Sequence, residues 1–215
     1  MTMYKKYIKR LLDIIFSLIL LPPVLSVILI CGIFIKLEDR GPIFYCGKRL
    51  GKDGKVFRMY KLRSMKVNAP DLRNEDGSTY NSDDDPRLTR VGKIIRKTSL
   101  DELPQLFNVL KGDMSFIGPR PDLPEHMNYY EGNEVRKLEV LPGISGYNQA
   151  YYRNAAEWKQ RLQNDVYYVN NISFWLDFKI LFKTVEGVIL RKGIYVTSQS
   201  DSAKGEDNNE QYIRS

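Results

Sequence analysis

The chain has 215 residues, of which 43% are hydrophobic and 27% charged, and its formal net charge is +7. This length suits one good-sized domain with a membrane or tail element, and the composition excludes a polytopic membrane protein. The positive charge indicates an acidic partner, which leaves nucleic acid, an anionic membrane leaflet and phosphorylated substrates open.

The cysteines and the histidine give no sign of a metal site. Cys31 lies in an apolar run and Cys46 just beyond it, without metal-ligand spacing or a disulfide framework. His126 lies in a polar stretch and is interpreted as a surface residue. A reducing, cytoplasmic setting is therefore expected.

Residues 11–35 form a long apolar segment that Pro22 and Pro23 interrupt near its middle. One straight helix of this length would rise roughly 37 Å, more than the roughly 30 Å hydrocarbon core, so a single transmembrane helix is one interpretation. The two prolines remove consecutive backbone donors and favour a break. Basic residues flank both ends, and the positive-inside rule places both flanks on the cytoplasmic face.

We therefore predict a re-entrant membrane anchor at residues 1–36, broken at Pro22 and Pro23, that enters and leaves one leaflet of the inner membrane. Residues 37–196 are predicted to form a mostly helical, cytoplasmic α+β catalytic domain with a small β element and interfacial amphipathic helices. The polar tail at residues 197–215 is predicted to be disordered.

The first part of this domain reads as a β-hairpin. A strand-like stretch begins at Gly41, residues 51–55 suit a turn, and residues 56–65 alternate apolar and polar side chains. Arg58, or Lys61 and Arg63, are candidates to converge on a phosphate, although a solvated basic edge strand fits the same pattern. Residues 68–85 read as a polar loop.

A basic helix at residues 87–98 leads directly to Asp101 and Glu102. Ser99 and Glu102 fit a capping box for an apolar helix that Gly112 ends. Asp101 is not needed for that box, and the helix dipole favours its ionised form. A carboxylate of low pKa beside cations is a candidate nucleophile or metal ligand, while an ordinary capped helix is the alternative.

Downstream, Arg120 lies between two prolines, and residues 122–139 are expected to be helical. The turn at residues 142–146 leads into an aromatic tract at 147–154 that suits either base stacking or core packing. Residues 155–192 are expected to form a helix, either in the membrane interface or packed on the core.

These motifs, in this order, resemble the small monotopic phosphoglycosyl transferases, the bacterial sugar transferases that begin polysaccharide, glycolipid and glycoprotein assembly. The resemblance spans residues 4 to about 196. The motifs that carry it are Lys9-Arg10 followed by Asp13, the proline-broken apolar segment, Tyr60-Lys61-Leu62-Arg63-Ser64-Met65, Ser99-Leu100-Asp101-Glu102-Leu103-Pro104-Gln105-Leu106, Gly118-Pro119-Arg120-Pro121, and Pro142-Gly143-Ile144-Ser145-Gly146.

The resemblance implies transfer of a sugar 1-phosphate from a UDP-sugar to polyprenyl phosphate, with release of UMP and a requirement for Mg²⁺. Asp101 and Glu102 match the catalytic dyad, with Asp101 as nucleophile and metal ligand. The residues that the resemblance implies bind substrate phosphates are Arg96, Arg120, Arg153 and Gln149. Lys61 and Arg63, from the alternating stretch, are added as candidates for the same role. Tyr152 stands where a glycine is common in the family, so no sugar identity is carried over.

Two other functions fit parts of the sequence. A membrane-anchored module that binds nucleic acid or another anionic ligand would use the cations but leave Asp101 and Glu102 without a role, so no nucleic-acid partner is expected. A metal-dependent phosphatase is the rival within enzymes. A homodimer and association with downstream glycosyltransferases stay open.

Overall fold

The computed structural model describes residues 3–72, 80, 82, 85–152 and 156–189 of the chain. Helices dominate and the sheets are small, as predicted for an α+β protein. The predicted tail at 197–215 lies outside the described residues. The helices and strands are α1 (Lys9–Asp39), β1 (Phe44–Leu50), β2 (Val56–Leu62), α2 (Arg90–Lys97), α3 (Gln105–Lys111), β3 (Ser115–Ile117), β4 (Gly143–Ser145), α4 (Tyr147–Tyr151), α5 (Trp158–Asn171) and α6 (Phe174–Ile189).

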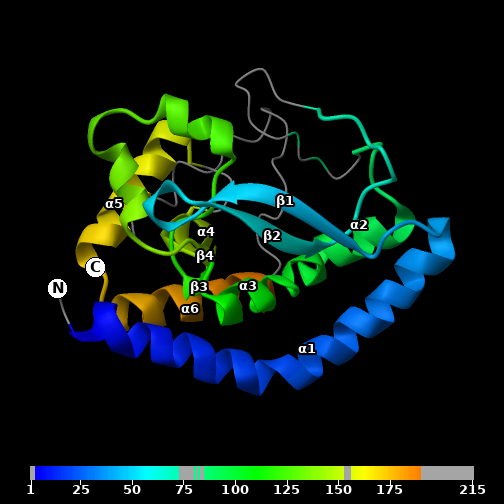
Figure 1. Cartoon of the computed structure of the whole chain (residues 1–215), viewed down its shortest axis with the longest axis horizontal. Helices are drawn as coiled ribbons and strands as arrows, with labels where there is room; N and C mark the ends of the chain where they lie inside the picture. Colours follow the sequence, from blue (N-terminus) through cyan, green and yellow to red (C-terminus); the bar gives the residue numbers. More distant parts are fainter. Residues whose placement is uncertain (1–2, 73–79, 81, 83–84, 153–155, 190–215) are drawn as a thin grey trace.

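Helix α1 is one continuous helix, so the predicted division into two helices at Pro22 and Pro23 is not what the structure has. Each proline removes one i→i−4 hydrogen bond, but the turns on either side keep theirs, and Ser26 Oγ donates to the Pro22 carbonyl at 3.3 Å. The helix bends near its middle (Figure 1), as expected where a proline pair interrupts the hydrogen-bond ladder. Residues Tyr4–Asp39 are long and apolar enough to cross a membrane by length and composition.

Both ends of α1 are bound to the same globular domain. At the start, Lys9 pairs with Asp177 of α6, and the Arg10 guanidinium donates to the Val109 and Leu110 carbonyls at the end of α3. Figure 1 shows α1 running from α6 past α3 to α2. The domain therefore contacts α1 on both sides of its bend.

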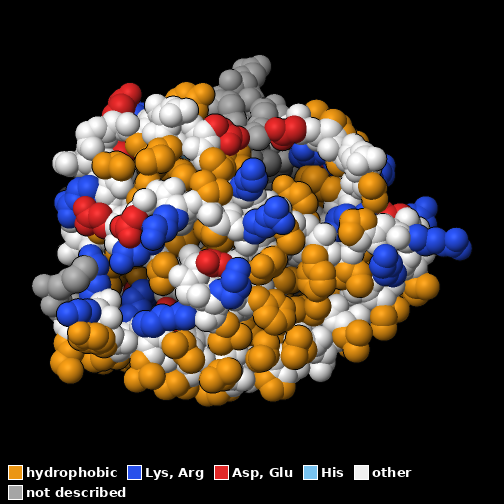
Figure 2. All heavy atoms as spheres, in the orientation of Figure 1, with side chains coloured by type: hydrophobic (Ala, Val, Ile, Leu, Met, Phe, Trp, Pro, Cys, Tyr) orange, Lys and Arg blue, Asp and Glu red, His pale blue; other side chains and the backbone are white. Residues whose placement is uncertain are grey.

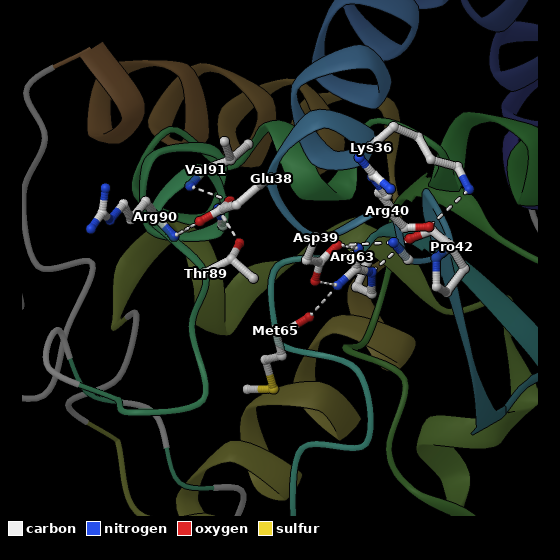
Figure 3. Close-up of polar contacts among 12 residues, drawn as sticks. Lys36, Glu38, Asp39, Arg40, Pro42, Arg63, Met65, Thr89, Arg90 and Val91 are labelled. Atoms are coloured by element: carbon white, nitrogen blue, oxygen red, sulfur yellow. Dashed lines mark hydrogen bonds and ion pairs between the residues drawn. The ribbon is translucent and has the colours of Figure 1, made fainter.

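At the other end of α1, two carboxylates make the contacts (Figure 3). Glu38 accepts hydrogen bonds from the backbone N–H groups of Arg90 (2.7 Å) and Val91 (3.0 Å), and so satisfies orphan donors at the start of α2. Asp39 accepts two hydrogen bonds from the Arg63 guanidinium, which follows β2. These contacts fix the end of α1 to α2 and to the end of β2, the elements that lead to Asp101 and Glu102 or to Lys61.

The predicted β-hairpin is confirmed: β1 and β2 pair antiparallel across a short turn at Lys52–Gly54. Strands β3 and β4 form a second, parallel pair. A Cβ atom on Gly143 would lie 2.1 Å from the Gly118 backbone nitrogen, so only glycine allows this close approach of the two backbones. The turn at 142–146 therefore packs directly against the chain that precedes Arg120.

Two predicted helices have a different form. Residues 122–139 contain two 3₁₀ segments, Pro124–Tyr129 and Gly132–Glu139, rather than an α-helix. The expected long helix at 155–192 is divided between α5 and α6 at Ile172 and Ser173, where Ile172 leaves helical geometry at ψ 119° and packs into the core with Tyr168 and Ile180.

A continuous apolar surface covers the outer side of α1. Hydrophobic side chains gather along the lower edge of the molecule in Figure 2, below the domain. Exposed aromatic side chains of α6, including Trp175 (69% exposed) and Phe182 (65%), add to the apolar surface of the protein. Apolar surface of this extent marks a site of interaction.

Candidate active site

Asp101 and Glu102 lie in a short 3₁₀ turn, Leu100–Glu102, between α2 and α3. The predicted capping box is wrong, because Ser99 has a left-handed backbone (φ 56°) and its side chain makes no cap hydrogen bond. A capping serine needs an extended backbone. Pro104 occupies the N-cap of α3 instead, so both carboxylates are free of a capping role.

Lys61 joins the two carboxylates. Its Nζ lies 2.7 Å from Glu102 Oε1 and 3.9 Å from Asp101 Oδ2. The side chains are mostly buried, at 18% exposed for Lys61, 10% for Asp101 and 24% for Glu102. Strand β2 therefore brings its predicted phosphate-binding lysine to the predicted dyad.

The two carboxylates titrate differently. Burial raises the pKa of Asp101 to about 6; Lys61 lowers it and the Glu102 charge raises it. Burial also acts to raise the pKa of Glu102, but the charges of Lys61 and Arg120 outweigh it and hold that pKa at about 2. The expectation of a low pKa for Asp101 is therefore wrong: desolvation exceeds the effect of a single 3₁₀ turn.

Arg120 adds a second cation beside Glu102. Its Nη2 lies 3.9 Å from Glu102 Oε1, and 57% of its side chain is exposed. Pro119 and Pro121 restrict the backbone on both sides of it. An exposed guanidinium on a stiff loop keeps donors available for an anion.

A buried ion-pair network supports the loop that carries Arg120. Lys137 is 4% exposed and pairs with Asp122 (2.5 Å) and Asp165 of α5 (2.8 Å). Tyr130 donates to the same Asp122 carboxylate at 2.7 Å. Asp165 also accepts from Asn148 of α4, so one lysine connects the Arg120 loop, α5 and α4. The sequence reading missed this network, because its members are far apart in the chain and carry no motif.

Arg96 and Gln149 each have buried polar atoms that form no hydrogen bond with a described residue. The Arg96 charge lowers the pKa of Asp101, and its buried Nη1 has no hydrogen-bond partner, with its nearest described carboxylate, Asp85, 3.9 Å away. The buried amide O and N atoms of Gln149 also have no hydrogen-bond partner among the described residues. The ideal Cβ position of Gly146 lies 3.0 Å from that amide oxygen and 2.1 Å from the Gly118 oxygen, which places Gln149 beside the chain leading to Arg120.

One predicted phosphate-binding residue, Arg63, is not brought to the carboxylates. Arg63 is 7% exposed, and all three of its side-chain nitrogens are engaged, by Asp39, the Pro42 carbonyl and the Met65 carbonyl. Its contacts make it a clamp between α1 and the end of β2. Arg153 lies outside the described residues.

The donor set suits a metal ion that also binds substrate. Within the described residues, no cluster of three or more His, Cys, Asp or Glu side chains is present. Asp101 and Glu102 nevertheless supply two neighbouring carboxylates, and Mg²⁺ commonly takes one or two carboxylates together with substrate phosphates and water. The residues therefore fit Mg²⁺ bound jointly with a phosphate.

A mostly buried carboxylate pair among lysine and arginine side chains is suited to a phosphate-bearing substrate. On an α+β domain with a long apolar helix, such a site indicates a transferase that acts on phosphate groups. Residues 4–191 match the model of the family described as bacterial sugar transferase. The chain belongs to that family, which confirms the predicted resemblance.

Several relatives are similar over most of the chain. An uncharacterized sugar transferase, EpsL, of Bacillus subtilis (strain 168) is 42% identical over 191 residues, or 89% of this chain and 92% of that protein. The UDP-N-acetylgalactosamine-undecaprenyl-phosphate N-acetylgalactosaminephosphotransferase of Aeromonas hydrophila is 41% identical over 85% of this chain and 44% of its own length. The undecaprenyl-phosphate galactose phosphotransferase of Salmonella typhimurium is 40% identical over 88% of this chain and 42% of its own length. The chain thus spans less than half of these last two relatives.

Proposed function

We propose that the protein is a membrane-bound phosphoglycosyl transferase that moves a sugar 1-phosphate from a UDP-sugar to polyprenyl phosphate. The observation that carries this proposal is the buried Asp101–Glu102 pair with Lys61 between the carboxylates and Arg120 beside Glu102. The names of the Aeromonas and Salmonella relatives, which are undecaprenyl-phosphate sugar phosphotransferases, support the substrate classes.

In the first step, an Asp101 carboxylate oxygen attacks the sugar-side phosphorus of the UDP-sugar. The bond from that phosphorus to the bridging oxygen breaks, and UMP leaves with the bonding electron pair. The product is a sugar phosphate joined to Asp101 as an acyl phosphate. With a pKa of about 6, Asp101 is mostly ionised near neutral pH and remains more basic than an ordinary aspartate.

In the second step, a phosphate oxygen of the polyprenyl phosphate attacks the same phosphorus. The acyl-phosphate bond breaks, the Asp101 carboxylate is regenerated, and a polyprenyl diphosphate sugar forms. Glu102 keeps Lys61 at the site through its 2.7 Å ion pair, while Lys61 and Arg120 offset the charge of two anionic substrates that must approach each other.

Asp101 and Glu102 would hold Mg²⁺ in this site. The ion, when bound, neutralises charge on the diphosphate of the donor.

The contacts of α1 support a re-entrant membrane topology. Lys9 and Arg10 at one end, and Glu38 and Asp39 at the other, bind the same domain. A helix that crossed the bilayer would place these ends on opposite sides, whereas a bent helix returns both to one side. The apolar outer face of α1 would lie in the cytoplasmic leaflet, with the carboxylate pair on the cytoplasmic face.

The test is turnover of purified protein with a panel of UDP-sugars and polyprenyl phosphate, measured as released UMP. Asp101→Asn is expected to abolish UMP release and to leave folding and membrane association unchanged. Asp53→Asn, at an exposed position in the hairpin turn, is the matched control and should retain wild-type turnover. Mass spectrometry of the trapped intermediate should find the phosphosugar on Asp101.

Appreciable turnover by Asp101→Asn, or an adduct on Glu102, would refute the assignment of the nucleophile. Release of inorganic phosphate without a lipid product would indicate a phosphatase. Salt-sensitive nucleic-acid binding without any UMP release would favour the binding module instead.

A further inference from the structure

One face of the β1–β2 hairpin is directed at the core and the site. The strand register pairs Tyr45 with Lys61, Gly47 with Met59, and Arg49 with Phe57, and residues paired in this way share a face of the sheet. On this face Met59 packs in the core against Val109 and Met114, and Lys61 reaches Glu102. Arg49 therefore lies on the face that carries Lys61. It is four residues along β1 from Tyr45, the residue that pairs with Lys61.

Arg49 is a partly buried cation on this face of the hairpin. Its Nη1 donates to the Lys48 carbonyl at 2.8 Å, and no described carboxylate forms an ion pair with it. Burial lowers the pKa of Arg49, and among the nearby charges Arg120 lowers it while Asp122 and Glu125 raise it. The Asp122 carboxylate is already engaged by Lys137 and Tyr130. The Leu50 N–H donates to the Asp122 carbonyl at 2.8 Å, so the strand that carries Arg49 is hydrogen-bonded to the loop that carries Arg120. Two neighbouring guanidinium groups repel each other, and a bound anion relieves that repulsion.

Gly47 gives the Arg49 side chain its position. An ideal Cβ on Gly47 would lie 3.1 Å from Tyr45 Cε1, 3.3 Å from the Tyr45 hydroxyl and 3.3 Å from Arg49 Nη1. The side chains of Tyr45 and Arg49 therefore both lie over a residue that has no side chain of its own. This arrangement limits the conformations of the guanidinium and lowers the entropy lost when it binds a ligand.

The proposed donor has two phosphates that need separate partners. Lys61 and Arg120 lie at the carboxylates, where the sugar-side phosphate is attacked. We infer that Arg49 binds the other, nucleotide-side phosphate of the UDP-sugar, beside Arg120. This inference rests on the proposed function and adds to it a residue that holds the leaving UMP. A guanidinium is suited to this because its planar fork can bind two phosphate oxygens at once.

The experiment compares Arg49→Ala with Lys48→Ala as a matched control. Lys48 is the preceding residue and carries the same charge, but it is exposed and paired with Arg58 on the opposite face of the hairpin. Arg49→Ala should weaken UMP binding and raise KM for the UDP-sugar by about 10-fold or more, the loss of one charge-assisted phosphate contact. KM for polyprenyl phosphate should change less than about twofold, and Arg49→Lys should restore part of the UMP affinity.

UMP binding is measured by calorimetry in the Asp101→Asn background, so that the result does not depend on turnover. If Arg49→Ala and Lys48→Ala bind UMP equally well, the inference is wrong. The same holds if Arg49→Ala raises both KM values alike while lowering the melting temperature, since that pattern indicates a structural role. A third outcome separates the two proposals. If UMP binding depends on Arg49 but the protein forms no lipid-linked product, the proposed function is wrong and the nucleotide site at Arg49 is supported.

Discussion

Replacing Lys61 with methionine should raise the pKa of Asp101 and move the acid limb of the pH–rate profile. Methionine keeps most of the unbranched side chain and removes the charge that lies 3.9 Å from the Asp101 carboxylate. Two unit charges about 4 Å apart interact by about 4 kcal/mol at an effective dielectric constant of about 20. Opposite charges at such distances lower carboxyl pKa values by about 1–3 units, so the pKa of Asp101, about 6, should rise by about one unit or more.

The assay is kcat/KM for the UDP-sugar between about pH 5 and 9, because this ratio reports the essential groups of the free enzyme. The attacking carboxylate must be ionised, so activity is present above its pKa and is lost as the pH falls through it. Wild-type activity should be half-maximal near pH 6. Lys61→Met should lose rate at every pH and have its half-maximum about one unit higher, whereas the exposed Lys48→Met should match the wild type.

The position of the limb separates this effect from a general loss of activity. An acid limb at the same pH in the wild type and in Lys61→Met would refute the electrostatic coupling of Lys61 to Asp101. A wild-type profile that stays flat down to about pH 5 would show that burial does not raise the pKa of the nucleophile above its ordinary value of 3.8.

Three further changes test other parts of the molecule. Arg120→Lys keeps the charge but loses the fork, so kcat/KM should fall at least about tenfold, about 1.4 kcal/mol, and wild-type kinetics would contradict two-point phosphate binding. Lys137→Met leaves two buried carboxylates without their cation, so chemical denaturation in detergent should show unfolding to be easier by about 3–5 kcal/mol; an unchanged midpoint would contradict the network. Replacing Pro22 and Pro23 with leucine should straighten α1 and let it cross the membrane. A cysteine at the N-terminus should then be labelled from outside intact cells, and such labelling of the otherwise native chain would exclude the re-entrant topology.

Features that depend on neighbouring residues were predictable. The alternation at 56–65 and the turn at 51–55 predicted the hairpin, and the basic stretch before Asp101 predicted α2. Both predictions rest on side-chain periodicity and turn residues, which act between neighbours in the chain. The placement of Arg120 beside the carboxylates came from the family resemblance, whereas Lys61 was a phosphate-binding candidate from the alternation at 56–65. The structure brings these four residues together.

Features that depend on tertiary contacts were not predictable. Arg63 follows the alternating pattern of the hairpin, but its guanidinium is taken by Asp39, 24 residues earlier in the chain. Ser99 matches the capping motif, yet its left-handed backbone excludes the cap. The raised pKa of Asp101 reflects burial that only the assembled domain creates. In each case packing, or a partner distant in sequence, determined a property that the local sequence pattern predicted differently.

The two carboxylates that end α1 bind this helix directly to the elements on either side of the active site. Glu38 holds the start of α2, which carries Arg96, and Asp39 holds Arg63, two residues after Lys61. A domain tethered by a linker changes its distance from the bilayer freely. In the proposed membrane-bound state this domain does not, so the carboxylate pair stays at one height and the lipid phosphate must rise to meet it. Bilayer thickness would then alter the reach of the acceptor, while the orientation of the protein stays constant.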